Sequence, residues 1–150
     1  MNIPSDIIAA VYIEQGTVCH YHLETINRDG TPYSGGRFLI VLNVNPKTDE
    51  ILVLTTITKQ IKNQTHYIKN IGEDPDTLVT ISPSDFSPLS VESIVNCNNT
   101  YETTMDELKS KMKKGGKFFT AKLPKTIVSA LVSGVLKSKQ VPPERKKLIV

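Results

Sequence analysis

The order of its secondary-structure signals is the feature that most constrains how this chain folds. Short β-rich runs bounded by turn residues fill residues 1–100, apart from one segment at 4–14. Apolar residues at the spacing of a helix become frequent only after residue 104. Strands followed by helices are typical of the α+β class. We therefore expect a small curled sheet or barrel with C-terminal helices packed at one end.

Five runs carry the strand pattern, at residues 17–23, 37–43, 51–58, 78–81 and 93–98. The second and third runs are joined by a tight polar connection, which predicts a hairpin. Both faces of the third run are apolar before its threonines, so we expect it to lie centrally in its sheet. Residues 25–36 and 59–77 are predicted to be polar loops, the second with a possible edge strand at 66–68.

The helical signals are stronger toward the C-terminus. Residues 4–14 fit either a short amphipathic helix or an irregular lead-in. A Thr-x-x-Glu capping box at 104–107 predicts a helix through about residue 113, where two glycines follow. Pro124 is predicted to open a second helix with one apolar face, and a short final helix is expected after the two prolines at 142–143.

Length and composition indicate one globular domain. The chain has 150 residues, of which 39% are hydrophobic and 22% charged, and these values exclude a disordered chain. We expect one domain over residues 1–150, with its core at about 15–138. Apolar runs stay far below the ~18 residues of a membrane span, and the N-terminus does not resemble a signal peptide. We therefore expect a cytoplasmic protein with no membrane partner, in which Cys19 and Cys97 are small buried hydrophobic residues.

The charge of the chain is unevenly distributed. Residues 1–100 hold 6 Lys and Arg against 11 Asp and Glu, whereas residues 101–150 hold 12 against 4. The basic C-terminal third indicates either an acidic partner such as nucleic acid or amphipathic helices with lysine-rich solvated faces.

Residue chemistry alone predicts no metal site and no cofactor. His20 and His22 point the same way from one strand, but only His66 remains as a third imidazole, and neither cysteine has zinc-ligand spacing. Motifs of the serine-nucleophile elbow and of nucleotide-binding loops are absent. The Lys-Lys-Gly-Gly-Lys run at 113–117 follows a predicted helix, so it is better explained as a helix end than as a phosphate loop.

Four segments, in this order, resemble the MazF/PemK-type ribonuclease toxins of bacterial toxin–antitoxin pairs. They are Gly-Thr-Val at 16–18, Gly-Arg-Phe-Leu-Ile-Val-Leu-Asn at 36–43, Leu-Thr-Thr-Ile-Thr at 54–58 and Ser-Ile-Val-Asn-Cys-Asn at 93–98. The helix that begins near Pro124 is similar to the closing helix of the family. The chain departs from the family pattern at Thr17, Phe38 and Lys59, where the family commonly has an acidic residue, Pro and Ser.

The resemblance implies an SH3-like (MazF/CcdB-like) barrel that forms a homodimer and cleaves single-stranded RNA without a metal or cofactor. In that chemistry the RNA 2′-hydroxyl attacks the adjacent phosphate, which leaves a 2′,3′-cyclic phosphate and a 5′-hydroxyl. Arg37 and Thr58 match the family's catalytic positions, where Arg37 would stabilise phosphate charge and Thr58 would hydrogen-bond the scissile phosphate. The alternatives are an ordinary arginine at a strand start and a threonine that favours strand conformation.

Five further residues are candidates for substrate binding. On the expected 25–36 loop, Arg28 would bind a backbone phosphate and Tyr33 would stack on an unpaired base. His20 or His22 would carry a proton, because imidazole titrates near neutral pH, and Lys59 adjoins Thr58. Each of them also fits an ordinary surface residue.

Two other functions stay open at this level. A CcdB-like protein would keep the barrel and the dimer and would act as a non-enzymatic gyrase poison. A barrel that has lost catalysis would serve as an RNA- or protein-binding module. A toxin of either kind implies a cognate antitoxin with an acidic disordered segment as a partner.

Overall fold

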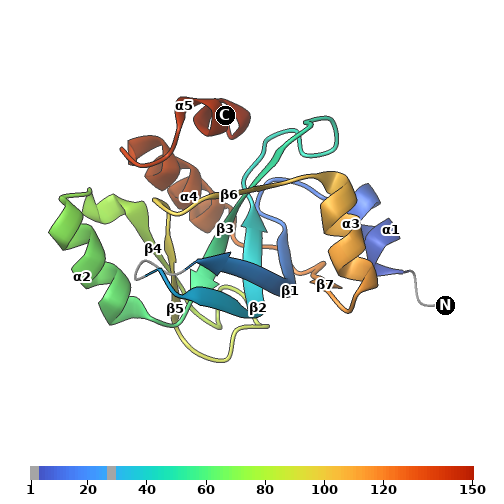
Figure 1. Cartoon of the computed structure of the whole chain (residues 1–150), viewed down its shortest axis with the longest axis horizontal. Coiled ribbons are helices and arrows are strands. Elements are labelled where there is room, and N and C mark those ends of the chain that lie inside the picture. Colours follow the sequence, from blue (N-terminus) through green and yellow to red (C-terminus); the bar gives the residue numbers. More distant parts are fainter. Residues whose placement is uncertain (1–3, 27–29) are drawn as a thin grey trace.

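A computed structural model describes residues 4–26 and 30–150, and Figure 1 shows helices arranged around a twisted sheet. The strands are β1 (Val18–Ile26), β2 (Pro32–Val41), β3 (Leu52–Thr58), β4 (Leu78–Ile81), β5 (Ser93–Asn96), β6 (Tyr101–Thr103) and β7 (Lys117–Phe118). The helices are α1 (Ser5–Tyr12), α2 (Ile61–Ile71), α3 (Met105–Lys113), α4 (Lys125–Lys137) and α5 (Pro143–Leu148), with a 3₁₀ turn η1 (Pro75–Thr77).

All pairings between these strands are antiparallel and join them into one sheet. Its order is β4-β5-β3-β2-β1-β7. β6 also pairs with β3, along Leu52–Leu54 at the start of that strand. The α+β class is therefore confirmed, and β3 has the predicted central position between β2 on one side and β5 and β6 on the other. Within the described ranges the sheet does not close into a barrel, because β4 and β7 remain at its two ends and α4 packs against β4.

The prediction of a polar loop over residues 25–36 is wrong for most of its length. β1 and β2 pair continuously from Val18–Ile40 to Ile26–Pro32, so residues 25–26 and 32–36 form the outer end of a two-stranded ribbon. Among the described side chains of this outer end, Ile26, Pro32 and Ser34 are exposed, Thr25 is half-buried, and none is buried. A strand exposed on both faces lacks the alternation of apolar and polar residues by which strands are usually predicted.

The prediction of a polar loop with an edge strand at 66–68 is also wrong, because residues 61–71 form helix α2. Gly72 ends the helix in the left-handed conformation, with φ of 69°, which glycine adopts without a steric penalty. Within α2, which lies wholly in the described part of the chain, Ile68 is the buried residue. Its apolar residues Ile61, Ile68 and Ile71 recur at helical spacing, but they are few among polar residues, so the segment was predicted to be a loop.

The remaining helices agree with the sequence predictions. Residues 4–14 contain helix α1, and α3 begins after Thr104, whose Oγ1 accepts a hydrogen bond from the Glu107 amide at 3.2 Å. α4 begins after Pro124 and α5 at Pro143. Among the described helices, none has the length and apolar content to cross a bilayer.

The sheet has an apolar core on each face, and Figure 1 shows α4 and α5 on one side and α1 and α3 on the other. Leu131 of α4 is fully buried in the first core, and Leu108 and Met112 of α3 lie in the second. Cys97 belongs to the first core and Cys19 to the second, and both are free thiols. Burial raises the pKa of each thiol to about 12, so both are neutral hydrophobic residues, as predicted.

Asn43, just beyond β2, closes the β2–β3 hairpin with a fully buried side chain. Its Nδ2 donates hydrogen bonds to Asp49 Oδ2 at 2.9 Å and to the Ile51 carbonyl at 2.8 Å. Its Oδ1 accepts a hydrogen bond from the Val53 amide at 2.6 Å. Both amide hydrogens and the carbonyl oxygen of Asn43 therefore have hydrogen-bond partners inside the hairpin. These three bonds can form together in only one register of β2 against β3.

Replacing Asn43 by Ala is expected to lower the free energy of unfolding by about 2–4 kcal/mol, because the buried Val53 amide loses its acceptor and the hairpin loses two more bonds. In urea unfolding, the midpoint should fall while the slope stays unchanged. The matched control is Asn45→Ala, at an exposed position of the same connection, with an expected change within about 0.5 kcal/mol. Equal stability of the two variants would contradict this role for Asn43.

Candidate functional site

The pairing of β2 with β3 brings Arg37 and Thr58 together. Phe38 pairs with Ile57 in this ladder. The next residues outward, Arg37 and Thr58, therefore stand opposite one another with their side chains on the same face of the sheet. The two catalytic residues that the resemblance implies thus lie side by side.

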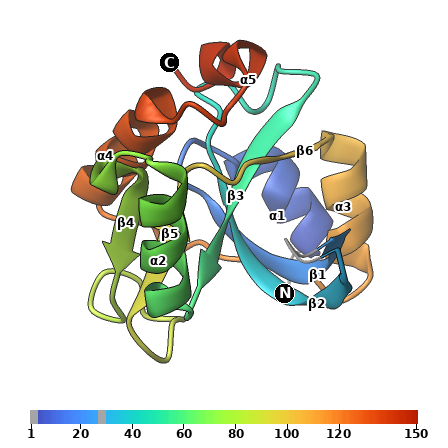
Figure 2. The same cartoon turned by 60° about the vertical axis from the view of Figure 1, so that its left-hand side comes forward.

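The face that carries Arg37 and Thr58 forms one wall of a hollow of about 740 Å³, and α2 forms the opposite wall. Figure 2 shows α2 standing beside β5 and the end of β3. Carboxamide side chains supply six of the lining residues, which are Gln60, Asn63, Gln64, Asn70, Asn96 and Asn99. Tyr67 of α2 and Tyr101 of β6 add two phenol rings. We call this the amide hollow.

A second hollow of about 330 Å³ adjoins the first. Its lining includes His20 of β1 and Lys59, and we call it the His20 hollow. Arg37, Thr58 and Gln60 line both hollows, so these three residues form a shared rim between them. A chain molecule that crosses the rim would contact Arg37 and Thr58 and would place its neighbouring units in the two hollows.

Arginine and lysine are the charged side chains among the described residues that line the two hollows. The chain holds 15 Asp and Glu, yet none of the described residues that line either hollow is acidic. Arg37 brings a permanent positive charge to the rim, and Lys59 adds another in the His20 hollow. A concave surface of one sign attracts ligands of the opposite sign, so the arrangement favours an anion.

The hydroxyl of Thr58 is oriented by the start of α2. Its Oγ1 accepts a hydrogen bond from the Gln60 amide at 3.3 Å. This bond uses a lone pair of the hydroxyl oxygen and leaves its hydrogen as a donor. Thr58 is therefore suited to donate a hydrogen bond to an anionic oxygen held by Arg37.

The ring of His20 lies against Gly36 and Phe38. A Cβ atom at Gly36 would lie 2.7 Å from His20 Cε1, so the glycine leaves the space that the imidazole fills. The ring meets Phe38 edge-on, with 4.8 Å between centroids. Desolvation, and secondly the positive charge of Lys117, lower the pKa of His20 below its ordinary value of 6.5. His20 is therefore neutral at pH 7 and able to accept a proton.

A polar network fixes α2 beside the sheet. Asn96 of β5 is buried, and its Nδ2 donates a hydrogen bond to Gln64 Oε1 at 3.0 Å. Asn96 Oδ1 accepts from the amide and the side chain of Asn98, at 3.0 and 2.9 Å. Asn98 in turn donates to Thr77 Oγ1 at 2.9 Å and accepts from Ser138 Oγ at 2.5 Å. The position of α2 is thus linked to the C-terminal end of α4.

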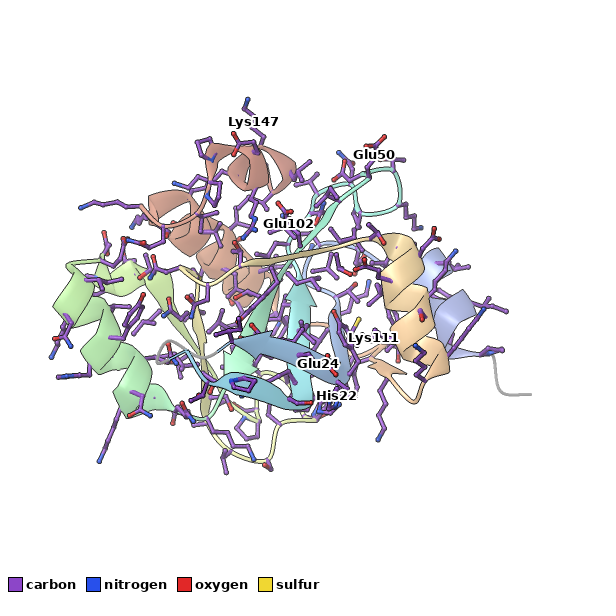
Figure 3. All side chains as sticks on the ribbon, in the orientation of Figure 1. His22, Glu24, Glu50, Glu102, Lys111 and Lys147 are labelled. Atoms are coloured by element: carbon purple, nitrogen blue, oxygen red, sulfur yellow. The ribbon has the colours of Figure 1, made fainter. Side chains whose placement is uncertain are left out.

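Of the other predicted substrate-binding residues, His20 and Lys59 line the His20 hollow, whereas His22 lines neither hollow. His22 is exposed, lies within hydrogen-bond distance of Ser34 Oγ and is 3.9 Å from Glu24 Oε1. Figure 3 shows His22 and Glu24 near Lys111 of α3, whose Nζ donates a hydrogen bond to the His22 carbonyl at 3.0 Å.

The two residues proposed for the 25–36 loop have different outcomes. Arg28 lies outside the described residues. Tyr33 belongs to β2, where its backbone pairs with that of Thr25. The base-stacking loop expected here is therefore replaced by a paired ribbon at Tyr33.

Sequence reasoning missed the wall that α2 contributes. Gln60, Asn63, Gln64, Tyr67 and Asn70 line the amide hollow and recur at intervals of three and four residues. That spacing was visible in the sequence, but it was carried by polar residues, and helices are usually recognised by apolar ones. Asn96, Asn99 and Tyr101 joined them only through the folding of β5 and β6 against β3.

A larger hollow, of about 1030 Å³, lies between α1, the segment 118–125 and α4. It is mainly apolar, and its Lys122 pairs with Glu14 at 3.0 Å. Because neither an imidazole nor an arginine lines it among the described residues, the two hollows at Arg37 are the better candidate for chemistry. Within the same residues, no cluster of three His, Cys, Asp or Glu side chains is placed to hold a metal ion.

The comparisons with known proteins give this site no family. No protein-family model matches the chain, and no curated protein matches it either.

Proposed function

We propose that this protein is an endoribonuclease that cleaves single-stranded RNA at a phosphate bound on the rim between the amide hollow and the His20 hollow. The observation that carries the proposal is the meeting of two hollows at a rim formed by Arg37 and Thr58, with no acidic side chain among the described residues that line them. A polyanion with one unit on each side of a phosphate fits this shape and charge. The resemblance to MazF/PemK-type toxins supports the same reaction.

The nucleophile in this reaction is the RNA 2′-hydroxyl next to the scissile phosphate. It is already part of the substrate, so the protein needs few groups to position it. Loss of the 2′ proton, attack of the oxygen on phosphorus and cleavage of the bond to the 5′ oxygen give a 2′,3′-cyclic phosphate. The departing 5′ oxygen takes up a proton and becomes a 5′-hydroxyl.

Arg37 and Thr58 act on the phosphate. The guanidinium donates paired hydrogen bonds to two phosphate oxygens, and its charge stabilises the more negative phosphorane. The Thr58 hydroxyl, held by the Gln60 amide, donates to one of the same oxygens. His20 pairs with Phe38 and so lies on the other face of the sheet from Arg37 and Thr58, but it lines the His20 hollow together with them. In this proposal its neutral imidazole accepts the proton of the 2′-hydroxyl where the RNA crosses the rim into that hollow.

The wider properties of the toxin family follow from the same resemblance. We propose that the strongly twisted sheet is related to the SH3-like fold, that the protein forms a homodimer, and that an acidic antitoxin covers the RNA site. The positive charges of Arg37 and Lys59 in these hollows support an acidic partner.

Arg37→Ala is expected to lower cleavage of a long RNA at least about 100-fold, because the phosphorane loses its main source of positive charge. Arg37→Lys should retain part of the activity, since it keeps the charge but not the planar fork. Thr58→Ala should lower the rate about tenfold, with partial recovery in Thr58→Ser, which keeps the hydroxyl. The assay measures RNA cleavage in EDTA and identifies the 5′-hydroxyl ends of the products.

Lys62→Ala is the matched control for charge, because Lys62 is exposed on α2 and lines neither hollow. It should cleave like the unaltered protein, and all variants should retain its far-UV circular dichroism. Unaltered cleavage by both Arg37→Ala and Thr58→Ala would overturn the proposal. RNA retention without cleavage by the unaltered protein would indicate a binding module instead.

The pH dependence of cleavage tests the role of His20. As pH rises, His20 loses its proton and becomes a base, so kcat/KM should increase through a midpoint below pH 6.5. Lys117→Met removes the nearby positive charge that helps lower the pKa, so it should move this midpoint upward. Lys114→Met, which changes an exposed lysine in the same region, should leave it unchanged. An identical midpoint in Lys117→Met and the unaltered protein would argue against His20 as the base.

A further inference from the structure

We propose that α2 reads an unpaired base of the RNA, with the carboxamides of Asn63 and Asn70 recognising its edge inside the amide hollow. This inference rests on the proposed function, because it assigns one nucleotide next to the phosphate at Arg37 to that hollow. It adds a base-specificity site on a helix whose sequence was predicted to be a loop.

The first support is the arrangement of the helix. Asn63, Tyr67 and Asn70 follow one another at spacings of four and three residues, so they form one stripe along α2. All three line the amide hollow, opposite the sheet face that carries Arg37. Asn63 and Asn70 are exposed, so their carboxamides are accessible from solvent.

The second support is that this stripe contributes little to packing. A helix that stands against a sheet usually turns an apolar stripe toward it. Here the buried residue of α2 is Ile68, while the side toward the hollow carries carboxamides, a phenol and the imidazole of His66. Asn is also a poorer helix former than Ala, so Asn63 and Asn70 are not explained by helix stability.

The third support is chemical complementarity. A carboxamide offers donors and an acceptor side by side, which matches the paired donors and acceptors on the edge of a nucleobase. Sequence-specific proteins read RNA mainly through single-stranded bases that hydrogen-bond at their edges and stack on aromatic rings. Tyr67 and Tyr101 supply rings in the lining of this hollow, and its volume of about 740 Å³ is sufficient for a nucleoside.

The position of the reading helix is also defined. The hydrogen bond from Asn96 to Gln64 holds α2 against β5, one turn along the helix from Tyr67 and beside Asn63. A base-reading surface needs such support, because discrimination between bases depends on donors and acceptors being held in place.

The test measures binding, so that it does not depend on cleavage. Homopolymeric 2′-O-methyl heptanucleotides of A, C and U lack the nucleophilic hydroxyl and stay intact. Fluorescence anisotropy gives their Kd values for the unaltered protein, for the double variant Asn63→Ala/Asn70→Ala and for the control Thr65→Ala. Thr65 lies on the same helix but does not line the amide hollow, and its hydroxyl bonds the Ile61 carbonyl.

For the unaltered protein, the Kd of the weakest-binding oligonucleotide is expected to exceed that of the tightest-binding one about tenfold or more. In Asn63→Ala/Asn70→Ala this ratio should fall to about threefold or less, while Thr65→Ala keeps it. Alanine favours the helix, so circular dichroism should show an intact α2 in the double variant.

The outcomes separate this inference from the proposed function. Equal Kd values for the three oligonucleotides in the unaltered protein, or an unchanged preference in the double variant, would overturn base reading by α2. Either result would leave RNA cleavage at Arg37 standing if the unaltered protein cuts RNA. Absence of any oligonucleotide binding would overturn the inference, and absence of RNA cleavage as well would remove the proposed function.

Discussion

The register of β2 against β3 is the constraint on which the candidate site depends, and the buried side chain of Asn43 sets it. Side chains alternate between the faces of a strand, so a slip of one residue would move Arg37 and Thr58 out of their opposition. Both amide hydrogens and the side-chain oxygen of Asn43 form hydrogen bonds within the hairpin that joins the two strands. The alternative registers would leave this buried amide unsatisfied. A residue in the hairpin thereby determines the geometry of a site at the far end of the same two strands.

The uneven charge of the chain has a different meaning in three dimensions. Part of the basic C-terminal third serves internal contacts: Lys137 pairs with Asp76 at 2.6 Å, and Arg145 pairs with Glu102 at 3.0 Å. Lys111 donates to a backbone carbonyl of β1. The two hollows, in contrast, lie mainly on the acidic first hundred residues, yet the described residues that line them include no Asp or Glu. The charges around Arg37 therefore give better support for an anionic ligand than the net charge of either part of the chain does.

Sequence reasoning predicted the elements whose patterns are enforced by burial or by capping. The hairpin of β2 with β3 and the N-cap at Thr104 are of this kind, and both were found. The second half of the predicted capping box differs, because the Glu107 carboxylate accepts a hydrogen bond from Thr103 Oγ1. The outer ribbon was missed because its outer end has no buried residue among those described, and α2 was missed because its few apolar residues stand among polar ones that are typical of a loop. Arg37 and Thr58 were singled out through a resemblance and lie side by side, but no local pattern could place α2 opposite them. That placement depends on contacts between residues distant in sequence, such as Gln64 with Asn96.

α2 has little apolar contact with the sheet, and the polar network of Asn96 and Asn98 compensates for it. A helix that presents carboxamides to a ligand gives up most of the apolar burial that would hold it to the sheet. Directional hydrogen bonds must supply the missing restraint, and they do so only where every buried partner is satisfied. Asn96 meets this condition, because its donor bonds Gln64 while its acceptor is occupied by Asn98. Asn98 is hydrogen-bonded to Thr77 and to Ser138, which caps the C-terminal end of α4. The position of α2, the wall of the amide hollow, therefore depends on how α4 packs.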